Sequence, residues 1–272
     1  MTLNDPSVNA TNQIPRADPF EEVIGTMKNF CGMVLLSFAK HGRGARDTTI
    51  RNFIARGMVS TESVHRVWLN GSEQDAWILH RSLLDRLFHL HHLAEHDEFE
   101  AFEDFSFKKM FEARERLLAD PDVGAQVPHS LKALQDSNRP QYKVLVQSGF
   151  VWHRPKAEEI AKAMGLGFLY RHGYDYASMH VHPMAFDGEW DFERLIKSPH
   201  NQNKPDPTVV RNTLLAQSML MQEALNSSSL RWRGIVYTFI EQIRSFSQTG
   251  SQDFGMTFLK IGKVWPEWEL CE

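Results

Sequence analysis

The chain has 272 residues, 42% of them hydrophobic and 24% charged, which is typical of one large globular domain. Its formal net charge of −4 argues against a strongly basic nucleic-acid binder, although a local basic patch is compatible with it. Two distant cysteines, Cys31 and Cys271, exclude a disulfide framework, and no apolar run approaches the roughly 20 residues of a membrane span. We therefore expect a cytoplasmic protein with no membrane segment.

The N-terminal half begins with a tail and a well-marked helix. Residues 1–16 are polar, with neither the basic start nor the apolar centre of a secretory signal, and are expected to be disordered. Asp18 followed by proline is typical of a helix start, and helical periodicity then continues to about Lys40. After a glycine-rich break at 42–45, shorter helical pieces are expected through Trp68.

Two long helices and an irregular region are expected next. Ser72 is a good cap for a helix that reaches about His96, because acidic residues follow it in the first turn. A second helix is predicted over residues 99–118. Residues 120–155 contain several prolines and the mildly strand-like run 142–146, so we expect an irregular insertion there, with room for a short strand.

The remaining half is also predicted to be helical. A loop rich in proline and asparagine interrupts it at 197–207. The predicted helices cover residues 155–165, 166–182, 206–226 and 230–247. The expected fold class is therefore all-α, an antiparallel helical bundle that forms a single domain over residues 17–272.

A polar stripe on the predicted helix 72–96 is the first candidate site. At about 100° per residue, apolar side chains occupy one broad face, and Arg81 lies at the edge of the opposite one. That opposite face holds, within about 60°, Asp85, His89, His92 and His96. The stripe is typical of a water-facing helix side, but it also suits contact with an anionic substrate or a metal. No metal ligand is assigned, because the inward Glu-x-x-His pairs of dimetal bundles are missing.

Three other residues of this helix have different expected roles. His80 and His91 lie on the apolar face, which favours hydrogen-bonded core histidines. Arg86 and His91 match the loose Arg-x(4)-His pattern of helical ribonucleases of the HEPN type. With 13 histidines in the chain such a match is expected by chance, and the two residues lie about 140° apart on the helix.

The second candidate site is the tyrosine- and histidine-rich segment 166–182. A stripe about 60° wide is formed by Arg171, Asp175, Ser178 and His182. His182 precedes a proline and is expected at a helix C-terminus, where the helix dipole favours the protonated imidazole. This placement suits a proton donor, an anion contact or a helix-end stabiliser. A Ser-His-Asp triad is disfavoured because no Gly-x-Ser-x-Gly turn is present, and a structural polar network is the remaining alternative.

Three short motifs lie within these segments: Arg-Ser-Leu-Leu-Asp at 81–85, Ile-Ala-Lys-Ala-Met-Gly at 160–165, and Tyr-x-Tyr-x-Ser-x-x-x-His-Pro at 174–183. Together they resemble a widespread family of mostly bacterial helical proteins that is catalogued as a domain of unknown function. Glutamate is usual in that family where this chain has Asp85. The resemblance, over about residues 75–183, implies an arginine–carboxylate pair facing a second helix. It implies no reaction, but it groups Arg81, Asp85, Ser178 and His182 in one element.

The first functional hypothesis is an enzyme, such as a hydrolase or nuclease, that acts on a phosphate-containing or nucleic-acid substrate. Arg81 and Arg171 would contact the anion, and His182 would be the general acid or base. The catalytic group would be completed by Asp85, Tyr174 and Ser178. The expected partners are a small phosphorylated molecule or nucleic acid, and no cofactor is assigned.

Two alternatives stay open. One is a non-enzymatic helical interaction module of bacterial stress or phage defence, with a second copy of the chain as a candidate partner. Trp265 and Trp268 would then anchor the interface. The other is a metal-dependent helical oxidase or hydrolase that uses Asp85 and the histidines of the same stripe.

Overall fold

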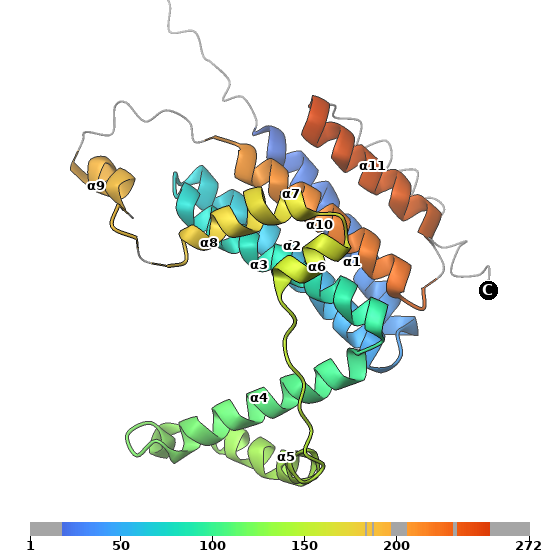
Figure 1. The fold of residues 1–272 in the computed structure, drawn as a ribbon, viewed down its shortest axis with the longest axis vertical. Coiled ribbons are helices and arrows are strands. Elements are labelled where there is room, and N and C mark those ends of the chain that lie inside the picture. The colour runs from blue at the N-terminus through green and yellow to red at the C-terminus, as the bar shows by residue number, and fades with distance from the viewer. Residues whose placement is uncertain (1–17, 183, 187, 197–205, 231–232, 251–272) are drawn as a thin grey trace, which may run out of the picture.

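The computed structural model in Figure 1 describes residues 18–182, 184–186, 188–196, 206–230 and 233–250. All regular elements of this part of the chain are helical and none is a strand, which confirms the predicted all-α class. None of these helices combines the length and the apolar character that crossing a membrane requires. The predicted tail 1–16, Trp265 and Trp268 lie outside the described residues.

Five long helices form the body of the molecule: α1 (Pro19–His41), α2 (Gly44–Leu69), α3 (Glu73–His96), α10 (Thr208–Ser227) and α11 (Arg233–Thr249). Helix α3 packs along both α2 and α10, and this places it at the centre of the body. Asp18 caps α1 as predicted, because its side chain accepts a hydrogen bond from the amide of Phe20. The shorter pieces expected through Trp68 are instead the single helix α2, whose buried face compensates for its weak helix formers.

A helical hairpin projects from this body, as Figure 1 shows. It consists of α4 (Phe99–Ala119), the short η1 (Gly124–Gln126) and α5 (His129–Gln147). The region expected to be irregular, with a short strand possible at 142–146, is therefore helical over His129–Gln147. Tyr142 and Leu145, three residues apart, lie on the side of α5 that is covered, and the Tyr142 ring stacks on Phe111 of α4 at 4.2 Å. Packing against α4 thus overrides the strand-like local sequence.

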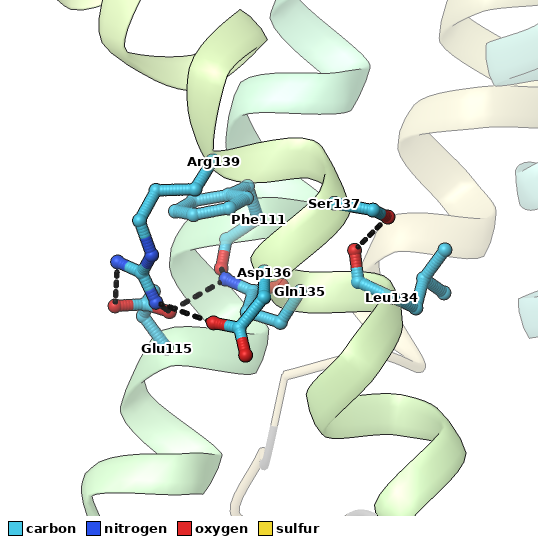
Figure 2. Close-up of polar contacts among 7 residues, drawn as sticks. All are labelled: Phe111, Glu115, Leu134, Gln135, Asp136, Ser137 and Arg139. Atoms are coloured by element: carbon cyan, nitrogen blue, oxygen red, sulfur yellow. Dashed lines mark hydrogen bonds and ion pairs between the residues drawn. The ribbon is translucent and has the colours of Figure 1, made fainter.

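Polar contacts hold the hairpin together (Figure 2). The buried Gln135 of α5 donates to the carbonyl oxygen of Phe111 at 3.1 Å and to Oε1 of Glu115 at 2.8 Å. Arg139 donates to both oxygens of Glu115, at 3.2 and 3.0 Å, with its guanidinium 5.7 Å from the centre of the Phe111 ring. Phe111 and Leu145 are buried outside the main core cluster, so the hairpin has a small core of its own.

The chain then returns to the body and crosses α3. This stretch comprises α6 (Ala157–Ala163), α7 (Gly167–Leu169), the π-helix η2 (Tyr170–Asp175) and α8 (Tyr176–Met179). Helices α6, η2 and α8 all pack against α3. The regular helix predicted over 166–182 is thus interrupted by a π-turn and ends at Met179, so His182 lies beyond the helix end. Helix α9 (Glu189–Ile196) follows and stands apart from the body in Figure 1.

Candidate functional site

Three of the predicted site residues meet where η2 crosses α3. The hydroxyl of Tyr174 accepts a hydrogen bond from Nη2 of Arg81 at 3.2 Å and donates one to Oδ1 of Asp85 at 3.0 Å. The guanidinium of Arg81 also lies over the Tyr174 ring, 4.9 Å from its centre. The expected arginine–carboxylate pair therefore does face a second helix, but the tyrosine hydroxyl joins its two members, which do not form a direct ion pair.

The local fold explains why Tyr174 reaches this position. Gly173, the residue before it, is buried, and a Cβ there would lie 3.3 Å from Cδ1 of Leu84, so the η2 backbone can approach α3 closely. The Tyr174 ring is held between Tyr170, stacked at 5.3 Å, and Phe88 at 5.9 Å. Ser178 donates to the backbone carbonyl of Tyr174 at 2.7 Å. The π-turn is a feature that is frequent at functional sites.

Burial and charge affect Tyr174 and Arg81 in different ways. Burial is the main cause that raises the pKa of Tyr174, and the adjacent Asp85 carboxylate adds to it, so the phenol stays protonated and donates to Asp85. Nε of Arg81 is buried and has no hydrogen-bond partner among the described residues. A buried donor without an acceptor costs free energy, so the Nε–H group of Arg81 is an unusual feature of the cluster.

His89 of the same α3 stripe is buried, with only 5% of its surface exposed. The interpretation of the whole stripe as a water-facing side is therefore wrong at this position, because the returning segment packs against α3. Nδ1 of His89 lies 2.6 Å from the carbonyl oxygen of Asp85 and must donate to it, which leaves Nε2 as the acceptor of the neutral ring. Nε2 is buried and has no partner in the described part of the chain, and burial is the main cause that lowers the pKa of His89.

The other two histidines of the stripe have structural partners. Nε2 of His92 lies 3.3 Å from Oε2 of Glu98, which also accepts a hydrogen bond from the indole of Trp152 at 2.7 Å. The exposed ring of His96 stacks on that of His92 at 4.2 Å. In the part of the chain that the structure describes, no three His, Cys, Asp or Glu side chains lie close enough together to hold a metal ion.

His80 confirms the prediction of a core histidine. Its Nδ1 lies 3.0 Å from Oγ1 of Thr213, which donates its own proton to the carbonyl of Val209 at 2.7 Å. Nδ1 must therefore be the donor, and burial lowers the pKa of His80 to about 4. His91 likewise has a partner, Glu223, at 2.9 Å. Arg86 binds the Ser82 carbonyl instead, so it and His91 have separate partners.

The remaining predicted residues lie at the surface. Arg171, Asp175 and His182 are exposed and take no part in the hydrogen bonds of the Arg81–Tyr174–Asp85 cluster. Ser178 reaches the cluster only through the backbone of Tyr174. His89 was predicted only as a member of the polar stripe and as a candidate for the metal-dependent alternative, with no acid–base role assigned to it.

Comparison with known proteins identifies the family of this chain. The model of a family of unknown function, DUF5677, matches residues 47–196, which is more than half of the chain. The chain belongs to this family. The part shared with DUF5677 runs from α2 to the end of α9 and includes the hairpin and the whole Arg81–Tyr174–Asp85 cluster. No curated protein and no solved structure matches the chain.

Proposed function

We propose that the protein is an enzyme that acts on a phosphate-containing or nucleic-acid substrate, with Arg81 as the residue that binds the anionic group. The observation that supports this proposal is the state of Arg81. Among the residues that the structure describes, no carboxylate lies within ion-pair distance of its guanidinium and no acceptor reaches its buried Nε, and Tyr174 fixes its orientation. An oriented guanidinium with free donors is a good ligand for a phosphoryl group.

The other members of the cluster position Arg81. Tyr174 accepts from Arg81 and donates to Asp85, so the carboxylate keeps the phenol in place without neutralising the arginine directly. Removal of the Asp85 carboxylate would leave the phenol free to turn away. Asp85 and Tyr174 thus support a preorganised anion contact, the arrangement that stabilises charge developing in a transition state.

A histidine would act as the general acid or base in this reaction, because the imidazole gains and loses a proton near neutral pH. His182 is the candidate predicted from the sequence, and it is exposed in the turn after α8, on the same segment as Arg171. His89 is a second candidate, because its unpartnered Nε2 lies on α3 one turn from Asp85. The two candidates are distinguished by substitution.

The experiment is an activity survey of the purified protein on phosphomonoesters, nucleotides and RNA, repeated with three variants. Arg81→Lys should abolish the activity found, because a lysine cannot reproduce the guanidinium contacts. His182→Ala should lower kcat at least 100-fold with the melting temperature nearly unchanged, and His129→Ala, an exposed histidine of the hairpin, should have no effect. Full activity in Arg81→Lys would refute the proposal. Full activity in His182→Ala with loss in His89→Gln would move the acid–base role to His89.

A non-enzymatic interaction module, for bacterial stress or phage defence, is the second candidate function. It is favoured by α9, on which Phe192, Leu195 and Ile196 share one helix face and are 62%, 82% and 64% exposed. We expect a second copy of the chain as the partner. Light scattering should show a dimer that Leu195→Glu dissociates, and a monomeric wild-type protein at high concentration would exclude this partner.

A further inference from the structure

A second group of cations lies beside the Arg81–Tyr174–Asp85 cluster, where α2 runs against α3. A Cβ added to Gly57 of α2 would lie 3.1 Å from Cδ1 of Leu83, so the two helix backbones are close at this point. Arg56 precedes that glycine and is exposed. Arg86 follows Leu83 by about one turn of α3, and this brings Arg56 and Arg86 together at the edge of the α2–α3 contact.

The two arginines have no acidic partner of their own. Arg86 is about half buried, and its Nη1 donates to the carbonyl and, at 3.3 Å, to the hydroxyl of Ser82 in the preceding turn. Neither arginine forms an ion pair with any residue that the structure describes. Burial, and after it the charge of Arg56, lowers the pKa of Arg86, as expected for two like charges held near each other.

The carboxylate of Asp85 acts on Arg86, and it is already engaged. Its charge favours the protonated form of Arg86, but its Oδ1 accepts the hydrogen bond of Tyr174. Arg81 and Arg86 thus both lie near this one carboxylate, and Arg56 adds a further positive charge beside Arg86. A chain with an overall charge of −4 therefore concentrates positive charge on this part of α3.

We propose that Arg56 and Arg86 form a second binding site for a phosphoryl group, next to the one at Arg81. This inference rests on the proposed function and narrows its substrate class. Arg81 and Arg86 are five residues apart, hence about 7 Å along the helix axis and well apart around it. One phosphate reaches only one of the two sites, so the substrate carries at least two separated phosphoryl groups. A nucleic-acid strand and a small bisphosphorylated molecule both have this chemistry.

The test compares wild-type protein with Arg56→Gln and, as a control, with Arg116→Gln, which removes an exposed arginine of the hairpin. Inorganic phosphate, fructose 1,6-bisphosphate and a labelled single-stranded oligonucleotide are titrated at low ionic strength. Arg56→Gln should raise the Kd of the ligand class that binds at least tenfold, and Arg116→Gln should leave it unchanged. If the strand is the ligand, the slope of log K against log salt should fall by about 0.7 for the lost contact.

The same variants separate a binding role from a structural one. Without any ligand, Arg56→Gln should leave the melting temperature equal to or above that of wild type, because it removes a like charge beside Arg86. An unchanged Kd for all three probes in both Arg56→Gln and Arg86→Gln would overturn the inference. Loss of activity in Arg81→Lys together with that result would leave the proposed function standing. Weaker binding in Arg56→Gln by a protein with no activity would leave only the binding site.

Discussion

Replacing Tyr174 by phenylalanine removes the hydroxyl that joins Arg81 to Asp85 and leaves the ring in place. Two hydrogen bonds are lost, at 3.2 and 3.0 Å, and each has a charged partner. Such bonds contribute about 1.5–3 kcal/mol each to the free energy of unfolding. Tyr174 is only partly buried and Arg81 can turn towards Asp85, so the expected net loss is about 2 kcal/mol, or a melting temperature lower by about 5 °C.

Tyr170→Phe is the matched control. Tyr170 stacks on Tyr174 at 5.3 Å, but its hydroxyl makes no hydrogen bond to any described residue, so the expected change is within about 0.5 kcal/mol. Urea unfolding at 25 °C and pH 7 measures both variants. Equal losses in the two variants, or no loss in Tyr174→Phe, would refute the assigned role of the hydroxyl.

The pH dependence of stability is a second test of the environment of Tyr174. The pKa of Tyr174 is raised in the folded protein, chiefly by burial, above its ordinary value of 10.0. Its contribution to the free energy of unfolding is therefore complete below pH 10 and is lost as the pH rises further, because the unfolded chain releases the proton first. Between pH 10 and 11, the free energy of unfolding should fall less in Tyr174→Phe than in wild type. An identical fall in the two proteins would contradict the raised pKa of Tyr174.

Three more predictions concern the core. Gly57→Ala forces a Cβ into side chains of α3 and α10, so it should lower the free energy of thermal unfolding by about 1–3 kcal/mol. Gly32→Ala has open space around it and should stabilise α1 by about 0.5–1 kcal/mol. The reverse order of stabilities would contradict the packing. In the folded protein the pKa of His80 is about 4, so its contribution to the free energy of unfolding is complete above pH 6.5 and is lost as the pH falls through 4. His80→Gln should remove about 3 kcal/mol of this loss at acid pH. If urea unfolding showed the same dependence of stability on pH in the variant, the prediction would be contradicted. Burial raises the pKa of Cys31 to about 12. In a Cys271→Ser variant at pH 8, a thiol reagent should therefore react with Cys31 at least 100-fold more slowly in the native protein than in denaturant. Comparable rates would place the thiol at the surface.

The helix boundaries that follow local rules could be predicted from the sequence. The start of α1 is set by Asp18 and the proline after it, and both the observed helix Pro19–His41 and α3, which ends at His96, lie within a residue or two of the prediction. Helix α5 could not be predicted in this way. Its run at 142–146 favours a strand locally, and only the stacking of Tyr142 on Phe111, contributed by another helix, makes it a covered helix face.

The candidate site was predictable in part for a similar reason. Arg81 and Asp85 share a helix face because they are four residues apart, which the sequence shows directly. The position of Tyr174 depends on the π-turn of η2, and a π-turn has no composition that marks it in a single sequence. The turn interrupts the regular stripe expected for Arg171 to His182. The burial of His89 also depends on a long-range contact, because the chain returns over α3 only after the hairpin.

Anion binding on α3 can be measured directly by a phosphate titration followed by the side-chain Nε–Hε resonances of the arginines, assigned with single Arg→Lys variants. We expect the resonances of Arg81 and Arg86 to shift with saturation at millimolar phosphate and those of Arg116 and Arg211 to stay in place. Shifts of equal size in all four resonances, or none in Arg81, would contradict an anion site on α3.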